Sequence, residues 1–298
     1  MIKKKLQVQW RLMRVHTLPA SVAPVLLTLV YAFLFYPRFS ILNAVLCAAV
    51  ALSAQICSNY ANDLIDYKKG CDTSERKGFE RPLSNGSVSV AEVKYGLYFW
   101  LTAMLLSGLW LVFNTHWTLL FVGLAVALGV FAYSGGPFPL SSNGLGDVAV
   151  LIFYGLVPML FTFYAVTGVL PDGTLWKMAF AMGFASVNIL VVNNYRDYEE
   201  DMKTGKRTVI VKFGKDFAPK LYMMCGMLSV ILFYPLFNMP SLLLVMLYVT
   251  LFFLPVYKNL VHYEGRALNR VLAMTGRNVL ILSLVGIAML LIKYRHWY

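Results

Sequence analysis

The sequence predicts an all-α membrane protein in which nine helices cross the bilayer. Hydrophobic residues make up 59% of the 298 residues and charged residues only 13%, whereas an average soluble domain has about 25% charged residues. The apolar residues are gathered in stretches of about 20, the length of helix that a hydrocarbon core requires. Composition and stretch length together exclude an ordinary soluble enzyme and make the lipid bilayer the surroundings of the chain.

The nine predicted spans are the uninterrupted apolar stretches of the sequence. In chain order they are residues 17–36, 40–62, 92–114, 117–134, 147–169, 174–195, 217–236, 240–257 and 275–294. Short connections alternate with long ones, and the long ones are residues 63–91, 135–146, 196–216 and 258–274. Because each span reverses the direction of the chain, we expect all four long connections on the side of the amino terminus.

The basic residues indicate which side of the membrane this is. Of the 26 Lys and Arg residues, 22 lie in the amino-terminal segment or in and beside the long connections. The positive-inside rule therefore predicts that the amino terminus and the long connections are cytoplasmic, with the carboxyl terminus outside the plasma or inner membrane. The net charge of +12 is spread between apolar stretches rather than along one soluble face, which argues against nucleic-acid binding.

Two carboxylates, Asp63 and Asp66, stand one helical turn apart in the segment in which the second predicted span ends. Asn62 lies on the same helix face as Asp66. Carboxylates this close repel each other and are poorly placed at the carboxyl end of a helix dipole, so a cation is expected beside them. Oxygen ligands of this kind suit Mg²⁺.

The sixth predicted span ends in a second cluster, in which Asn193, Asp197 and Asp201 recur every four residues. Lys206 and Arg207 follow closely and could bind the outer oxygens of a phosphate group. Either cluster alone could be a solvated helix end with internal ion pairs. Two such clusters on the same membrane side favour a diphosphate bridged by Mg²⁺ as their common ligand.

The two clusters resemble the motifs of the UbiA-type superfamily of intramembrane aromatic prenyltransferases. Asn62-Asp63-Leu64-Ile65-Asp66 is similar to its Asn-Asp-x-x-Asp motif, and Asp197 to Asp201 fits its Asp-x-x-x-Asp motif. Residues 133–137, 144–147, 194–197 and 205–208 resemble those of the members that prenylate 1,4-dihydroxy-2-naphthoate. The resemblance implies a single domain over residues 1–298, a bundle of nine helices and cytoplasmic catalytic loops.

The resemblance also implies an activity: Mg²⁺-dependent transfer of a polyprenyl group from polyprenyl diphosphate to 1,4-dihydroxy-2-naphthoate, with loss of CO₂ and diphosphate, giving demethylmenaquinone. The metal ligands that it implies are Asn62, Asp63, Asp66, Asp72, Asp197 and Asp201. Tyr133 is expected beside the allylic group, where its ring would stabilise positive charge. We assign substrate binding to Arg14, Lys68, Arg81, Asp147, Asn193, Asn194, Arg196, Lys206 and Arg207.

Several of these assignments have alternatives. Tyr133 could pack at the membrane interface, Arg14 could anchor the first span, and Asp147 could cap a helix. The acceptor could be 4-hydroxybenzoate, homogentisate or a chlorophyllide, as in other members of the superfamily. A membrane transporter is the alternative from a different class, but transporters usually hold their site near the midplane between repeated halves, and both clusters here lie at helix ends.

Overall fold

The computed structural model describes residues 2–68, 70, 77–79 and 81–295, without the side chains of residues 2–7 and of His16. The described residues form helices and loops, and no strand occurs among them. The α-helices are α1 (Ile2–Met13), α2 (Leu18–Phe35), α3 (Ile41–Lys68), α4 (Val90–Asn114), α5 (Leu119–Ala132), α6 (Gly146–Leu151), α7 (Val157–Thr167), α8 (Gly173–Arg196), α9 (Tyr198–Lys203), α10 (Val209–Phe213), α11 (Phe217–Ile231), α12 (Met239–Tyr248), α13 (Leu254–His262) and α14 (Leu268–Arg295).

The all-α membrane architecture is confirmed. Eight helical segments in the described part of the chain are long and apolar enough to cross a membrane. The predicted span 117–134 corresponds to α5, which is apolar but only 14 residues long. Short π-helical segments, Ile152–Leu156 and Val249–Phe253, join α6 to α7 and α12 to α13, so that each pair forms one span. The eight spans and α5 together account for the nine predicted segments.

Two predicted connections are shorter than expected. α3 continues to Lys68, so the connection after it begins later than residue 63, and Asp63 and Asp66 lie in the last turns of the helix, as their spacing predicts. The predicted connection 258–274 is reduced to residues 263–267, because α13 runs to His262 and α14 begins at Leu268. Basic residues interrupt the apolar pattern in this region, but long basic side chains extend along a helix toward water and do not end it.

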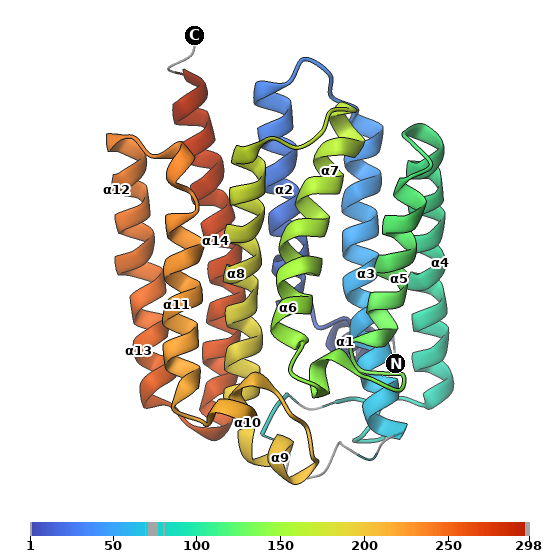
Figure 1. Cartoon of the computed structure of the whole chain (residues 1–298). Coiled ribbons are helices and arrows are strands. Elements are labelled where there is room, and N and C mark those ends of the chain that lie inside the picture. Colours follow the sequence, from blue (N-terminus) through green and yellow to red (C-terminus); the bar gives the residue numbers. More distant parts are fainter. Residues whose placement is uncertain (1, 69, 71–76, 80, 296–298) are drawn as a thin grey trace.

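α8 is the central helix of the bundle. Sixteen of its 24 residues are buried, whereas only three of the 25 residues of α4 are. Two glycines bring α8 close to the span that α6 and α7 form, since a Cβ atom on Gly155 would lie 2.5 Å from both the Ala179 carbonyl oxygen and Gly183 Cα. Figure 1 shows α11 to α14 on one side of α8 and α3 to α5 on the other.

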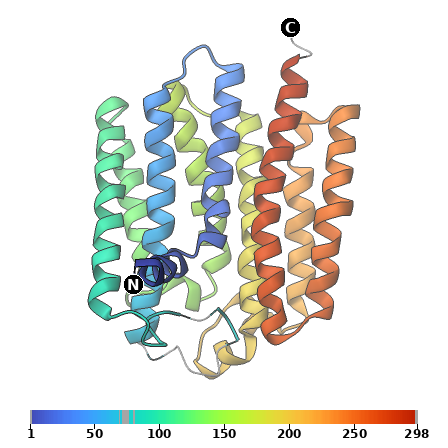
Figure 2. The same ribbon diagram turned by 180° about the vertical axis from the view of Figure 1, so that it is seen from behind.

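The two ends of the bundle differ. The short helices α9 and α10 and the described part of the α3–α4 connection lie at one end, and the last residues of α14 lie at the other (Figure 1). The helix α1 lies across the bundle at the same end as α9 and α10, which is clearest from behind (Figure 2). Both acidic clusters stand at this end, because α3 and α8 finish there.

Candidate active site

A cavity of about 980 Å³ extends between α2, α3, α5, α7 and α8. Its end nearest α9 is lined by charged side chains, among them Asp63, Asp66, Asp197 and Asp201. Farther along the helices its walls become apolar, with Val50, Leu111, Leu119, Val122 and Phe161 among the lining residues. Cavities of about 300 to 1,000 Å³ are typical of ligand sites, and this one changes from polar to apolar along its length.

The first acidic cluster is held by two arginines. Asp63 is 1% exposed, and its Oδ1 accepts a hydrogen bond from Arg14. Arg81, from the α3–α4 connection, places its Nε 3.4 Å from the same oxygen and its Nη1 2.8 Å from Asp66 Oδ2. Arg14 adopts a left-handed backbone with a φ of 49°, which is uncommon outside glycine and is found more often at functional sites. The cluster thus joins two carboxylates to two guanidinium groups from distant parts of the chain.

The second cluster lies at the bend between α8 and α9. Asp197 N–H donates to the Asn193 carbonyl (3.0 Å) and Asp201 N–H to the Asp197 carbonyl (2.8 Å), so the four-residue interval persists through the bend. Arg196 donates from Nε and Nη2 to the Asp197 carboxylate, each at 2.7 Å. Its Nη1 donates to Asn269 on α14 (2.7 Å). The bidentate pair fixes the Asp197 carboxylate beside the cavity.

Asp201 and Lys206 form a third charged contact at the same end. Lys206 Nζ lies 3.0 Å from Asp201 Oδ1, and both residues line the cavity. Burial raises the pKa of Asp201 above its ordinary value, and the nearby ammonium offsets this only in part. Burial lowers the pKa of Lys206, but the Asp201 carboxylate outweighs it, so the pKa of Lys206 is raised. Lys206 therefore remains a cation at neutral pH.

Tyr133 and Asn62 complete the polar end. Tyr133 follows α5 directly and lines the cavity. Asn62 Oδ1 is buried and forms no hydrogen bond with the described residues. Asn193 and Asn194 also line this end. A phenol and a buried amide oxygen without a hydrogen bond to described residues therefore stand beside the four carboxylates.

Three of the assigned residues that the structure describes do not line the cavity. Lys68 and Arg207 are exposed and do not belong to the lining. Asp147 lies in the first turn of α6 without capping it, and its buried Oδ1 forms no hydrogen bond with described residues. Asp72 lies outside the described residues.

The α3–α4 connection is attached to α9 and α14 beside the site. Lys77 Nζ lies 2.8 Å from Glu199 Oε2, and Lys215 Nζ lies 3.0 Å from Glu199 Oε1. Asn269 Nδ2 donates to the Lys77 carbonyl at 3.0 Å. The hydrogen bond from Lys77 lowers the pKa of Glu199 to about 2, with a further contribution from Lys215 against the opposing effect of burial. These contacts fix the position of the segment that contains Phe79, which lines the cavity.

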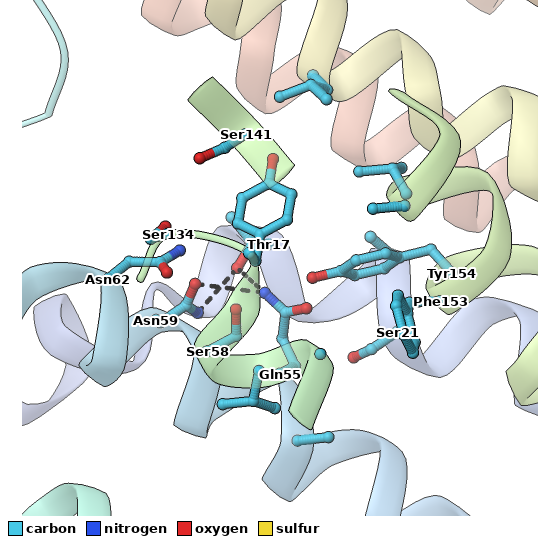
Figure 3. A pocket seen from close by; sticks show the side chains of 18 of the residues that line it. Thr17, Ser21, Gln55, Ser58, Asn59, Asn62, Ser134, Ser141, Phe153 and Tyr154 are labelled. Atoms are coloured by element: carbon cyan, nitrogen blue, oxygen red, sulfur yellow. Dashed lines mark hydrogen bonds between the residues drawn. The ribbon is translucent and has the colours of Figure 1, made fainter. Parts of the chain in front are cut away.

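A group of uncharged polar residues deeper in the cavity was missed by the sequence interpretation. It comprises Thr17, Ser21, Gln55, Ser58 and Asn59. Figure 3 shows them around one space between α2 and α3, with Tyr154 pointing in from the facing wall. The available signal was the interval: Gln55, Asn59, Asn62 and Asp66 recur every three or four residues along an otherwise apolar helix.

The sequence of this chain matches a known protein family. The model of the UbiA prenyltransferase family matches residues 21–282. The 1,4-dihydroxy-2-naphthoate octaprenyltransferase of Haemophilus influenzae is 36% identical over 221 residues, which cover 72% of this chain and 71% of the relative. The enzyme of the same name from Escherichia coli is 32% identical over 236 residues, covering 77% and 76%.

Solved structures share the fold. The structure of a UbiA homolog from Archaeoglobus fulgidus bound to DMAPP and Mg²⁺ has a TM-score of 0.67 at 18% identity and covers 95% of this chain and 99% of its own. The apo structure of a UbiA homolog from Aeropyrum pernix K1 has a TM-score of 0.68 at 16% identity, covering 94% and 97%. On the family match and the identities above 30%, the chain belongs to the UbiA prenyltransferase family and is a multi-pass membrane prenyltransferase.

Proposed function

We propose that this enzyme transfers a polyprenyl group from polyprenyl diphosphate to 1,4-dihydroxy-2-naphthoate, with Mg²⁺ as its cofactor, and releases diphosphate and CO₂. The observation that carries the proposal is one cavity that joins two pairs of carboxylates to an apolar channel. The carboxylate end suits a metal-bound diphosphate, and the channel suits a long hydrocarbon tail. The acceptor is inferred from the sequence segments and from the names of the relatives.

The donor atoms fit Mg²⁺ shared with a substrate. No three His, Cys, Asp or Glu side chains among the described residues lie close enough together to hold an ion. Each cluster instead offers two carboxylates, and Asn62 adds a buried oxygen that forms no hydrogen bond with described residues. Mg²⁺ commonly takes one or two carboxylates and fills its other positions with water and substrate phosphates. Asp63, Asp66, Asp197 and Asp201 are therefore the proposed ligands, with Asn62.

The basic residues of the site bind the diphosphate. Arg81 and Lys206 lie against the carboxylates that would hold the metal. Guanidinium and ammonium groups donate well to phosphate oxygens, so each can bind carboxylate and phosphate together. When bound, Mg²⁺ would neutralise the charge on the diphosphate as the allylic C–O bond breaks.

The acceptor supplies the electrons for the new bond. The ring carbon that bears the carboxylate attacks the terminal carbon of the prenyl group as the C–O bond to diphosphate breaks. Loss of CO₂ then returns the electron pair of the C–C bond to the ring, so no base has to remove a ring proton. The product is the reduced form of demethylmenaquinone. Tyr133, beside the carboxylates, presents an aromatic face that stabilises the allylic positive charge.

The prenyl tail occupies the apolar part of the cavity. This region includes Gly108 on α4 and Gly123 on α5. A Cβ atom on Gly123 would meet no atom within 4 Å, and one on Gly108 would meet only Val50 Cγ2 at 4.0 Å. The two glycines thus widen the channel where α4 and α5 form its wall. For orientation we propose a cytoplasmic amino terminus and cytoplasmic acidic clusters, because the basic residues are concentrated at that end.

The decisive experiment uses the purified full chain in lipid vesicles. With Mg²⁺, a polyprenyl diphosphate and 1,4-dihydroxy-2-naphthoate labelled in its carboxylate, we expect labelled CO₂ and a lipophilic quinol in equal amounts. Chelation with EDTA is expected to stop both, and added Mg²⁺ to restore them. Folded protein that makes no quinol from this acceptor but prenylates 4-hydroxybenzoate would replace the proposed acceptor.

A further inference from the structure

The polar face of α3 continues into the cavity beyond the metal-binding end. Gln55 stands seven residues before Asn62 on the same face, about 10 Å along the helix axis. Gln55 is only 6% exposed, in a helix that spans the membrane. A buried amide at this depth is costly unless its hydrogen bonds are made, so each of its atoms needs a partner.

The described contacts satisfy only one half of this amide. Gln55 Nε2 donates to Thr17 Oγ1 (3.2 Å) and to Asn59 Oδ1 (3.3 Å). The Thr17 hydroxyl donates its own proton to the Arg14 carbonyl (2.8 Å), so it can only accept from Gln55, which fixes the orientation of the amide. Gln55 Oε1 is consequently directed away from these partners. It is buried and forms no hydrogen bond within the part of the chain that the structure describes.

The facing wall is aromatic and carries a hydroxyl. Phe153 and Tyr154 both line the cavity, although they are adjacent in sequence. They lie in the π-helical segment Ile152–Leu156, and such segments frequently occur at functional sites. The Tyr154 hydroxyl points toward the Gln55 amide and lies near enough to interact with it, and Ser21 and Ser58 border the same space (Figure 3). This region thus offers flat apolar faces, three hydroxyl groups and the Gln55 Oε1 acceptor.

We propose that Gln55 and Tyr154 form the acceptor subsite and that Gln55 Oε1 accepts a hydrogen bond from the ring hydroxyl of a dihydroxylated bicyclic aromatic acid. This inference rests on the proposed function and adds the residues that select the acceptor. The hydroxyl farther from the carboxylate faces Gln55, while the carboxylate and the reacting carbon face Arg14 and the acidic clusters. A phenol both donates and accepts, so it binds Gln55 Oε1 and the Tyr154 hydroxyl together.

The test compares two ligands that differ by one hydroxyl. Turnover of 1,4-dihydroxy-2-naphthoate gives its KM, and competition with 1-hydroxy-2-naphthoate, which lacks the second hydroxyl, gives a Ki. Gln55→Leu removes the acceptor atom, and we expect the KM of the dihydroxy acid to rise about tenfold, as for the loss of one hydrogen bond. The Ki of the monohydroxy acid and the KM of polyprenyl diphosphate are expected to stay within about twofold. Tyr154→Phe, which keeps the ring, is expected to act in the same direction.

Asn188→Leu is the matched control. Asn188 is another buried amide whose Oδ1 forms no hydrogen bond with described residues, but it does not line the cavity. Its replacement is expected to leave both constants unchanged. Equal effects of Gln55→Leu on the two aromatic ligands, or no effect on either, would overturn the subsite. Wild-type protein that does not convert the dihydroxy acid at all would instead overturn the proposed function.

Discussion

Arg81 Nη1 lies 2.8 Å from Asp66 Oδ2, although the two residues are fifteen positions apart and belong to a helix and to the connection after it. The connection therefore folds back over the end of α3 and delivers a cation to the carboxylates. Arg81 is 8% exposed, so its charge is largely shielded from water and depends on these partners. Arg81 therefore makes the charge balance around Asp66 depend on the conformation of the α3–α4 connection.

Replacing Arg81 is expected to weaken binding of the diphosphate. Arg81→Ala should raise the KM of polyprenyl diphosphate at least about tenfold, since a charge-assisted hydrogen bond is lost. Arg81→Lys should have an intermediate effect, because an ammonium cannot donate in the bidentate geometry. Initial rates in vesicles measure both. Arg38→Ala is the control. Arg38 is exposed in the connection between α2 and α3, at the end of the bundle away from the site, and its replacement should leave the KM of polyprenyl diphosphate unchanged.

The carboxylates are expected to be essential for turnover but not for insertion. Asp66→Asn and Asp197→Asn keep the size of the side chain and remove the charge that would bind Mg²⁺. We expect kcat to fall at least about a hundredfold, with the same amount of protein in the membrane fraction. Variants that keep wild-type rates at saturating Mg²⁺ would show that these residues are not metal ligands.

The channel lined by Gly123 is expected to limit the prenyl chain. A phenylalanine at this position enters open space, so the helix is preserved while the channel is narrowed. Gly123→Phe should lower kcat/KM for long polyprenyl diphosphates about tenfold or more and should spare a short donor such as dimethylallyl diphosphate. Product mass spectrometry with mixed donors measures the preference. Gly173→Phe, also in open space but outside the cavity lining, should leave the preference unaltered.

The Glu199 contacts are expected to persist across the physiological pH range. The pKa of Glu199 is lowered to about 2, so the stabilisation is fully present above the ordinary value near 4.5 and is lost as pH falls toward 2. An activity profile between pH 5 and 8 should therefore be the same for wild type and Glu199→Gln. Trypsin should nevertheless cleave the variant faster at Lys77, because the Lys77 side chain loses its carboxylate partner. Equal cleavage rates would contradict the attachment.

Much of this site could be predicted from local sequence. Intervals of three residues (Asp63 to Asp66) and four residues (Asp197 to Asp201) placed these carboxylates at helix ends, since spacing along one helix is a local property. Arg14 and Arg81 were assigned to substrates, and their contacts with Asp63 were not foreseen, because those contacts join residues from separate segments. Gln55 was overlooked because a single amide barely changes the apolar pattern of a span.

The close contact between Gly155 and Gly183 has a mechanical consequence. It ties the aromatic wall of the cavity to α8, whose end carries Asp197, so the surfaces that hold the reacting groups are joined into one stiff unit. α4 packs mainly on α3 and has few buried residues of its own. The spacing between the aromatic wall and the charged end therefore depends on the span of α6 and α7 and on α8, and not on α4.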